Sequence, residues 1–342
     1  MIVSLPQDRR FDAITFGRAN MDLYTEAEKS IEETQTFTKS LGGSPANIAV
    51  AMARLGMKTG MITAVADDPI GAYVTSFLAN FGVDTSAIVR DASGTSTSLA
   101  VAETRGTGSR TVLYRNNAAD MALRPQDIQK TYIADARMLV ISGQALSRSP
   151  AREAAMTALT YARAAGTLVV LDIDYRPYSW IDEETAAVVL SQAAEASDVV
   201  IGTRDEFDAL EYLRNSEIAT SKRSSDTFVT DHATAEHLFS HGVAQLVVVK
   251  RGEAGSFGWT RDGECVRGPA YPVKPLKPYG AGDAFAGALL FGINRGQSWS
   301  DCFSIAAAAA SINISRTRCA EDMATWEEIA DFLQERNSAL SH

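Results

Sequence analysis

Short apolar segments rich in β-branched residues alternate with longer segments of helical periodicity along much of this 342-residue chain. The predicted strands are residues 11–17, 59–66, 138–142, 167–173, 198–201 and 245–249, and the predicted helices are residues 45–55, 70–81, 151–165, 183–196 and 205–213. Two strands contain continuous apolar runs, Val169-Val170-Leu171 and Leu246-Val247-Val248-Val249, as expected for strands covered on both faces. This alternation predicts an α/β fold with a mainly parallel sheet and right-handed crossovers.

Two segments interrupt this alternation. Residues 21–39 are polar and predicted to be extended, whereas residues 95–103 and 110–115 alternate in polarity around Arg105-Gly106-Thr107-Gly108. The second pattern predicts a β-hairpin. We interpret the two segments, about 18–40 and 95–117, as a small β lid on the main sheet, and an ordinary pair of edge strands is the alternative.

The C-terminal third of the chain is predicted to be helical, over residues 282–295, 299–315 and 326–338. A polar stretch before it, residues 213–231, predicts a surface loop or a frayed helix. Neither an internal repeat nor a linker divides the sequence, so we expect a single domain over residues 1–342.

Composition excludes several classes of partner. A net charge of -10 and a pI near 5.0 argue against nucleic acid or an anionic membrane as the main partner. No uncharged apolar run approaches the ~20 residues that span a bilayer. The first ten residues lack the apolar core of a signal peptide, and the three cysteines have no metal-binding spacing. We therefore expect a cytoplasmic protein with reduced thiols.

The segment Gly280-Ala281-Gly282-Asp283 precedes an apolar and therefore buried helix. Neither a Walker A motif nor G-x-G-x-x-G occurs in the chain. Glycine N–H groups at a helix N-terminus nevertheless form an anion site. Asp283 is then either a general base beside that site or a plain helix N-cap.

A second glycine motif, Gly42-Gly43-Ser44-Pro45-Ala46-Asn47, opens another predicted helix. Asn47 lies among apolar residues, which favours a ligand contact or a buried hydrogen bond. Arg115 ends the predicted hairpin, and Arg176 lies beyond a predicted strand, where ligands of open α/β sheets bind. Each arginine taken singly could equally be a solvated surface group.

Together these motifs resemble the ribokinase/pfkB family of carbohydrate kinases. The resemblance extends from Phe11 to the last helix and includes Lys250-Arg251-Gly252-Glu253-Ala254-Gly255, which is similar to a family stretch beside ATP. It implies a ribokinase-like three-layer α/β/α sandwich with a mainly parallel central sheet and a small β lid. It also implies ATP and Mg2+ as cofactors.

The resemblance assigns roles to named positions. It makes Asp283 the general base and the backbone of Gly280, Ala281 and Gly282 the anion hole. The residues implied to bind the sugar are Asp22, Gly42, Gly43, Asn47, Arg115, Asp174 and Arg176. Those implied near ATP are Thr203, Arg204, Lys250, Gly252, Gly255 and Asn313, with Glu206 near magnesium through water.

Three segments, Gly17-Arg18-Ala19, Val200 to Phe207 and Asp174 to Trp180, are most similar to the branch of the family that phosphorylates keto-deoxy sugar acids. Two arginines at one pocket also favour an acid over fructose, ribose or adenosine, because Arg binds a carboxylate bidentately. The expected reaction is phosphorylation of the terminal (C6) hydroxyl of 5-dehydro-2-deoxy-D-gluconate in inositol breakdown. The alternatives are a 2-keto-3-deoxygluconate kinase, a kinase for another sugar, and a non-catalytic sugar- or nucleotide-binding regulator. Free lid edges favour a homodimer through the lid.

The chain departs from the family pattern at three positions. Thr203 replaces an Asn near magnesium, and Asp174 replaces the Asn of 2-keto-3-deoxygluconate kinases. Lys277 stands where the family has an Asp that helps to bind a monovalent cation. We expect the Lys277 ammonium to substitute for that cation, and an exposed lysine is the alternative.

Overall fold

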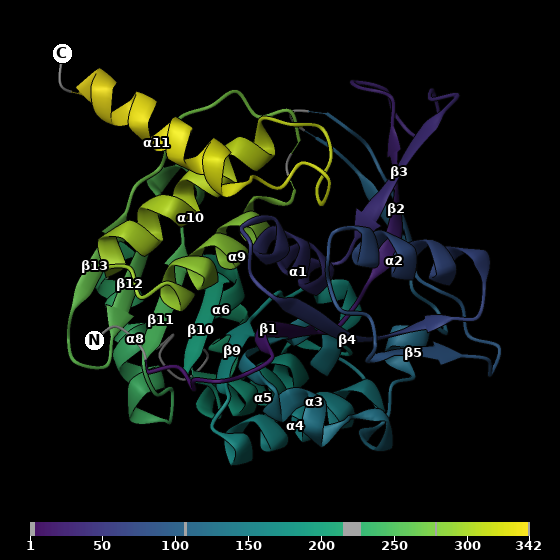
Figure 1. Cartoon of the computed structure of the whole chain (residues 1–342), viewed down its shortest axis with the longest axis horizontal. Helices are drawn as coiled ribbons and strands as arrows, with labels where there is room; N and C mark the ends of the chain where they lie inside the picture. Colours follow the sequence, from purple (N-terminus) through teal and green to yellow (C-terminus); the bar gives the residue numbers. More distant parts are fainter. Residues whose placement is uncertain (1–3, 106–107, 215–226, 278, 341–342) are drawn as a thin grey trace.

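A nine-stranded sheet forms the centre of the computed structural model, which describes residues 4–105, 108–214, 227–277 and 279–340. The strand order is β13-β12-β11-β10-β9-β8-β1-β4-β5 (Figure 1). Seven neighbouring strands, from β11 to β5, run parallel, and β12 pairs antiparallel with both β11 and β13. The strands are β1 (Phe11–Phe16), β4 (Thr59–Ala66), β5 (Ile88–Asp91), β8 (Ala136–Ser142), β9 (Leu168–Asp172), β10 (Val199–Thr203), β11 (Leu246–Lys250), β12 (Ser256–Thr260) and β13 (Cys265–Gly268).

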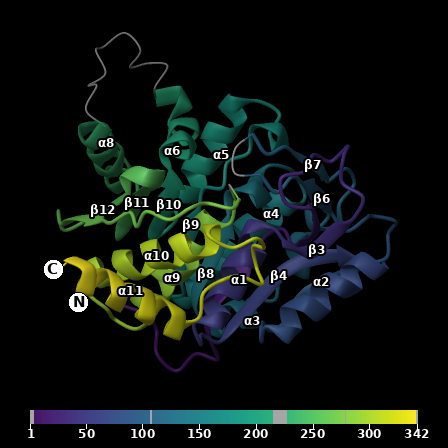
Figure 2. The same cartoon turned by 90° about the horizontal axis from the view of Figure 1, so that it is seen from above.

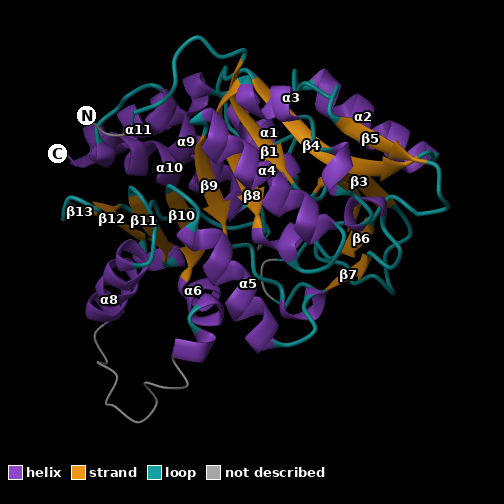
Figure 3. Cartoon of the chain, turned by 90° about the horizontal axis from the view of Figure 1, so that it is seen from below, coloured by secondary structure: helices purple, strands orange, loops and turns teal. Residues whose placement is uncertain are grey.

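Helices cover both faces of this sheet, as Figures 2 and 3 show. One face packs on α1 (Ser44–Arg54), α2 (Pro69–Asn80), α9 (Ala281–Asn294), α10 (Trp299–Ile314) and α11 (Trp326–Leu340). The other packs on α3 (Lys130–Ala134), α4 (Ala151–Ala165), α5 (Glu183–Glu195), α6 (Arg204–Leu210) and α8 (Thr227–Ser240). Short 3-10 turns are η1 (Ala119–Met121), η2 (Pro125–Asp127), η3 (Gly143–Leu146), η4 (Pro177–Ser179) and η5 (Gly252–Ala254).

Strand β11 shows why the central strands of the main sheet contain continuous apolar runs. Leu246 and Val248 belong to one buried cluster, whereas Val247 and Val249 belong to the cluster on the opposite face. Side chains alternate across a strand, so a strand covered on both faces is apolar at every position. The predicted three-layer sandwich is thereby confirmed. No helix among the described residues combines the length and apolar character needed to cross a membrane.

A separate four-stranded sheet, which we call the lid sheet, has the order β3-β2-β6-β7. It consists of β2 (Asn20–Thr25), β3 (Phe37–Gly42), β6 (Leu99–Ala102) and β7 (Thr111–Tyr114), and it projects beside the main sheet in Figure 1. The predicted hairpin corresponds to the antiparallel pair β6 and β7. The polar segment before it supplies β2 and β3, which also pair antiparallel.

Some elements were missed or misplaced. The sequence pattern did not predict β5, β12 or β13, and α6 ends at Leu210 rather than at residue 213. The strands β12 and β13 contain glycines because Phe303 of α10 packs against them: a Cβ at Gly258 or Gly268 would collide with its ring. Residues 215–226 of the predicted polar loop lie outside the described residues, and α8 begins at Thr227.

Candidate active site

Polar side chains gather at the edge of the main sheet where its parallel strands end, which we call the carboxyl edge. Arg18 follows β1, Gln144 lies in η3 after β8, Asp174 follows β9, and Lys250 ends β11. The register pairs Ser142 with Asp172 and Thr203 with Lys250, so these strands end at the same level. The candidate site lies along this edge, where open α/β folds bind ligands.

Asp283 lies in the first turn of α9, the buried helix whose N-terminus faces the carboxyl edge. The N-cap residue is Gly280, with φ of 92°, and no side chain caps the helix. Asp283 is therefore not a helix cap. The residues just before it, 280–282, form what we call the anion loop, whose backbone N–H groups have no intrahelical partners.

Helix α1 holds the Asp283 carboxylate in place. Ser44 Oγ donates a hydrogen bond to Oδ1, and Asn47 Nδ2 donates one to Oδ2, both at 2.8 Å. The two helices approach closely, since a Cβ at Gly287 would meet Ala51 of α1 at 2.6 Å. Asn47 thus makes a buried hydrogen bond to the predicted base. Burial raises the pKa of Asp283, and the bond from Asn47 only partly offsets this effect.

Further carboxylates surround Asp283 at the end of β9. Asp172 Oδ2 lies 3.2 Å from Ser44 Oγ, and its Oδ1 lies 3.5 Å from Lys250 Nζ. Burial raises the pKa of Asp172 to about 7, against the effect of Lys250. Asp174 has φ of 37°, a strained value for a residue other than glycine. Its carboxylate accepts from Ser142 Oγ at 2.8 Å.

Two cations balance these carboxylates. Arg176 lies 3.0 Å from Asp174 and 3.7 Å from Glu206, and Asp174 raises its pKa. The pKa of Lys250 is also raised: burial would lower it, but Asp172 and the other nearby carboxylates outweigh burial. Lys250 Nζ lies 3.4 Å from the position that a Cβ of Gly282 would occupy. A positive charge therefore adjoins the anion loop.

This donor set fits a nucleotide phosphate and a hydrated divalent cation. Lys250 and the anion loop would hold phosphate oxygens. Glu206, Asp172 and Asp174 offer carboxylate oxygens, the ligands that Mg2+ prefers, while Mg2+ usually keeps several of its waters. Within the described part of the chain, no three His, Cys, Asp or Glu residues are close enough to ligate a metal directly. The fit is accordingly to magnesium held through water.

The predicted nucleotide residues on α6 have structural partners. Thr203 is the N-cap of α6, and its capping box with Glu206 is reciprocal: Glu206 Oε2 accepts from Thr203 N–H at 2.7 Å. The Thr203 hydroxyl therefore caps α6 at the position where the family has an Asn. Arg204, expected near ATP, instead contacts Asp208, Glu211 and Asp231 at 2.9–3.1 Å and is largely buried. Its guanidinium is thus already paired with carboxylates.

Gly252 and Gly255 form the turn from β11 to β12, with φ of 56° and 86°. A Cβ at Gly255 would collide with the carbonyl of Gly268, so the turn requires a glycine there. The turn follows Lys250 at the carboxyl edge, and its contact with ATP stays a prediction.

Lys277 is completely buried, which excludes the exposed alternative. Its Nζ donates to Asn313 Oδ1 at 2.6 Å, to Asn313 O at 2.8 Å and to Tyr279 O at 3.1 Å. Burial lowers the pKa of Lys277. Three acceptors nevertheless match the three N–H donors of an ammonium group. Lys277 thus brings a positive charge into a shell of oxygen atoms directly behind the anion loop.

Asn313 was expected near ATP, but its side chain is completely buried and fully hydrogen-bonded. Its Oδ1 lies 2.6 Å from the position that a Cβ of Gly280 would occupy. Asn313 therefore supports the anion loop from beneath. The loop is also tied to the lid sheet, because Tyr279 stacks on Tyr24 and donates through its hydroxyl to Glu103 O at 2.7 Å.

The far end of the site lies beside the lid sheet. Asp22 of β2 accepts from Asn20 Nδ2 at 2.6 Å and from Tyr24 OH at 2.9 Å. A Cβ at Gly42 would collide with the Asp22 carboxylate, which explains the glycine at that position. Gly43 has φ of 99° and caps α1. Asp22, Gly42 and Gly43 thus lie together, and their binding of a sugar stays a prediction.

Arg115 lies at this end, whereas Arg176 contacts a different group of side chains. Arg115 pairs with Asp120, at 3.0 and 2.5 Å, and donates to Gln144 Oε1 at 3.0 Å. Arg18 Nε donates to the same Gln144 oxygen at 3.2 Å. Contrary to expectation, the partner of Arg115 at this end is Arg18, and Arg176 belongs with the carboxylates around Asp283.

Sequence reasoning missed four residues of the site: Ser44, Asp172, Arg18 and Gln144. Ser44 and Arg18 lie within motifs that were recognised, and Asp172 ends a predicted strand, so their positions carried a signal. The position of Gln144 carried no such signal, because only the fold brings η3 beside Arg18 and Arg115.

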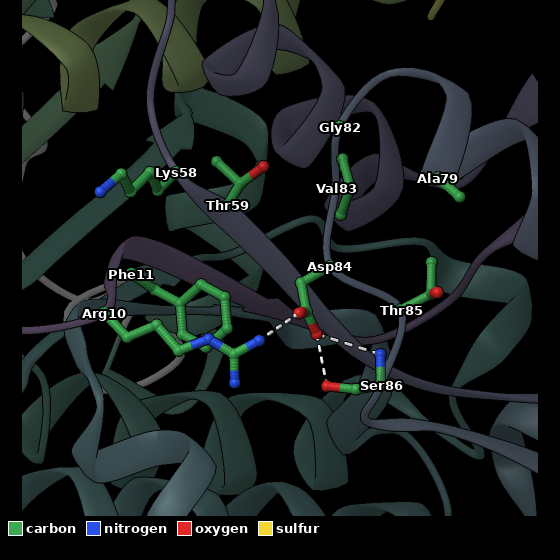
Figure 4. A pocket seen from close by; sticks show the side chains of 10 residues that line it. All are labelled: Arg10, Phe11, Lys58, Thr59, Ala79, Gly82, Val83, Asp84, Thr85 and Ser86. Carbon is green, nitrogen blue, oxygen red and sulfur yellow. Dashed lines mark hydrogen bonds and ion pairs between the residues drawn. The ribbon is translucent and has the colours of Figure 1, made fainter.

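A surface pocket lies elsewhere, at the opposite edge of the sheet. Its lining includes Phe11 and Thr59, the first residues of β1 and β4, and an ion pair of 2.7 Å between Arg10 and Asp84 (Figure 4). The carboxylates around Asp283 lie at the other ends of the strands. This pocket is therefore not part of the candidate site.

The chain is similar to known proteins over nearly its whole length. Residues 11–326 match the pfkB family of carbohydrate kinases. The chain is 43% identical over 338 residues to a 5-dehydro-2-deoxygluconokinase of Geobacillus kaustophilus (strain HTA426), covering 98% of this chain and 97% of that protein. It is also similar to a crystal structure of fructokinase with bound ATP from Xylella fastidiosa, with a TM-score of 0.81, 27% identity, and coverage of 95% and 99%. A third likeness is to a ribokinase II from E. coli in complex with ATP and Mg2+, with a TM-score of 0.82, 22% identity, and coverage of 95% and 99%.

Proposed function

Because the chain belongs to the pfkB family of carbohydrate kinases, we propose that it transfers the γ-phosphoryl group of ATP to the C6 hydroxyl of 5-dehydro-2-deoxy-D-gluconate, in myo-inositol catabolism. The observation that carries the proposal is the Asp283 carboxylate, held by Ser44 and Asn47 at the head of α9. The 43% identity to a 5-dehydro-2-deoxygluconokinase supports this choice of sugar.

In this reaction Asp283 takes the proton of the sugar hydroxyl as the hydroxyl oxygen attacks phosphorus. Ser44 and Asn47 fix the carboxylate orientation, so that an oxygen lone pair faces the hydroxyl. A raised pKa makes Asp283 a stronger base than an exposed aspartate. The accepted proton stays on Asp283 until the product leaves.

The remaining residues stabilise negative charge. The N–H groups of the anion loop face the charge that develops on the transferred phosphoryl group, and Lys250 adds a fixed positive charge beside Gly282. Glu206, Asp172 and Asp174 would hold hydrated magnesium, which neutralises phosphate charge when bound. Lys277 is proposed to act as a built-in monovalent cation behind the loop.

A homodimer through the lid sheet belongs to the same proposal. The lid sheet ends in edge strands β3 and β7, whose exposed apolar side chains include Phe37, Val112 and Tyr114. Light scattering with size-exclusion chromatography tests the dimer, and a monomer at micromolar concentration contradicts it.

Steady-state ADP release across a panel of sugars tests the proposed substrate. We expect the highest kcat/KM for 5-dehydro-2-deoxygluconate, lower values for 2-keto-3-deoxygluconate, and little turnover of fructose or ribose. Equal or better use of fructose would contradict an acidic substrate.

Asp283→Asn separates a kinase from a non-catalytic regulator. General base catalysis typically contributes ~10²–10⁴ to the rate, so kcat should fall by about 100-fold or more while ATP binding stays nearly intact. Unchanged turnover would remove Asp283 from the mechanism. A wild-type protein that binds ATP and sugar without turnover would support the regulator.

A further inference from the structure

Resting on the proposed function, we propose that Arg18 and Arg115 together bind the carboxylate of the sugar acid, and that Arg18 determines the preference for an acid. Both guanidinium groups donate to a single atom, Gln144 Oε1, from Arg18 Nε at 3.2 Å and from Arg115 Nη1 at 3.0 Å. Two cations are thus held side by side on one neutral oxygen.

The two arginines differ in their counter-charges. Arg115 has Asp120, whose Oδ2 accepts from Nε and Nη2. Across the described ranges, Arg18 has no carboxylate within the 4.0 Å of an ion pair. Its Nη1 donates to Asn20 Oδ1 at 2.8 Å. Its Nη2 has no described hydrogen-bond acceptor and is accessible to solvent.

The nearest acidic side chain does not neutralise Arg18 by contact. The two oxygens of Asp22 accept from Asn20 and Tyr24. Burial, together with repulsion from Arg115, lowers the pKa of Arg18 and outweighs the opposite effect of Asp22, Asp120 and Asp174. A half-buried guanidinium beside a like charge is costly until an anion joins it. A carboxylate facing the free Nη2 edge would supply the missing charge and accept charge-assisted hydrogen bonds.

The location suits the end of the sugar opposite the reacting hydroxyl. The carbonyl oxygen of Arg18 packs against Gly43, where any Cβ would collide with it. Gly43 immediately precedes Ser44, which bonds Asp283. A linear sugar acid with its hydroxyl at Asp283 can therefore extend past Gly42 and Gly43 toward Arg18. Arg176 is a weaker candidate for this role, because Asp174 and Glu206 already neutralise it.

Calorimetric titration without ATP tests the site directly, with two ligands that differ only at one end: 2-deoxygluconate and its neutral counterpart 2-deoxyglucitol. We expect the wild-type protein to bind the acid about 10- to 100-fold more tightly, as expected for charge-assisted hydrogen bonds to an arginine. Arg18→Gln should remove most of this preference while leaving the affinity for the neutral ligand and the KM for ATP unchanged. Arg18→Lys, which keeps the charge without the planar fork, should restore part of it.

Arg137→Gln is the matched control, since Arg137 is a partly buried arginine at the start of β8, on the opposite edge. Thermal unfolding of all variants checks folding. Equal losses of affinity for the acid and the neutral ligand in Arg18→Gln would indicate a merely structural role and overturn the proposal, as would an unchanged preference for the acid.

Turnover by the wild type separates this proposal from the proposed function. If the wild type turns over fructose best, yet prefers 2-deoxygluconate to 2-deoxyglucitol only when Arg18 is present, the proposed function fails and the proposed carboxylate site stands. If the wild type turns over the keto acid but Arg18→Gln still prefers 2-deoxygluconate, only the proposed carboxylate site fails.

Discussion

Lys277→Ala is the substitution for which the structure gives the sharpest expectation. The side chain is completely buried, and its Nζ is the hydrogen donor for Tyr279 O, Asn313 O and Asn313 Oδ1. Removing it leaves Asn313 Oδ1 without a described donor, whereas Asn313 O keeps the N–H of Arg316 and Tyr279 O keeps the thiol of Cys319. The same removal deletes a positive charge that helps to hold the loop.

The magnitude follows from these contacts. One orphaned buried acceptor costs about 1–3 kcal/mol. At an unfolding entropy of about 2.1 cal/mol/K per residue, a chain of 342 residues loses about 1.4 °C of Tm per kcal/mol, which gives a loss of roughly 1–4 °C. Lys277 acts behind the loop instead of touching phosphate. We therefore expect kcat to fall by about 10-fold or more, less than for loss of a direct oxyanion donor.

Chemical rescue provides the assay. ADP release and thermal unfolding are measured at constant ionic strength in choline, potassium or propylammonium chloride. Carbonyl oxygens can replace the hydration shell of potassium, and propylammonium replaces the deleted part of the side chain. We expect the wild type to be indifferent to the cation, and Lys277→Ala to recover activity and Tm in potassium or propylammonium. Lys274→Ala is the control, because Lys274 is an exposed lysine three residues upstream.

Two results would refute this reasoning. Strong activation of the wild type by potassium would mean that Lys277 does not replace the cation. Unchanged Tm and kcat in Lys277→Ala would mean that the three hydrogen bonds contribute nothing to the loop.

Two further predictions concern the lid and the carboxylates. Tyr279→Phe removes the bond to Glu103 O, so we expect about 1 kcal/mol less stability and a higher KM for the sugar, measured by unfolding and ADP release. Asp172→Asn should change how the Tm depends on pH. The pKa of Asp172 is raised to about 7, so the folded state binds a proton more tightly than the unfolded state. Ionisation of Asp172 therefore destabilises the wild type as pH rises from about 4 to about 7, and the Tm of the wild type should fall relative to that of Asp172→Asn over this range.

Each of these predictions has a control. Tyr161→Phe, at a tyrosine on α4 away from the lid, should leave the KM unchanged, and an equal effect of both tyrosine substitutions would contradict a lid contact. Asp182→Asn has the opposite sign: hydrogen bonds at the N-terminus of α5 lower the pKa of Asp182, so its contribution is lost only as pH falls below about 4. A Tm difference between wild type and Asp172→Asn that stays constant from pH 4 to 7 would contradict the raised pKa.

Local sequence determined six of the nine strands of the main sheet and most of the helices that cover it. Continuous apolar runs such as Val247 and its neighbours identify strands covered on both faces, and this information needs no distant residue. Glycines at 42, 43 and 280 likewise revealed tight turns and close approaches. The edge strands β12 and β13 escaped prediction because their glycines reflect the packing of Phe303, a residue distant in sequence.

Within the candidate site, sequence alone identified Asp283 and the anion loop but left the role of Asp283 undecided. Only the tertiary structure excluded the helix cap, because no side chain caps α9 and the Asp283 carboxylate accepts from Ser44 and Asn47 of another helix. The same holds for the arginines. Sequence placed Arg115 and Arg176 at the carboxyl edge, but the fold pairs Arg176 with carboxylates and Arg115 with Arg18 across Gln144. The sequence determines which residues carry a positive or a negative charge. The partner of each charged side chain depends on which strand ends become neighbours when the sheet assembles.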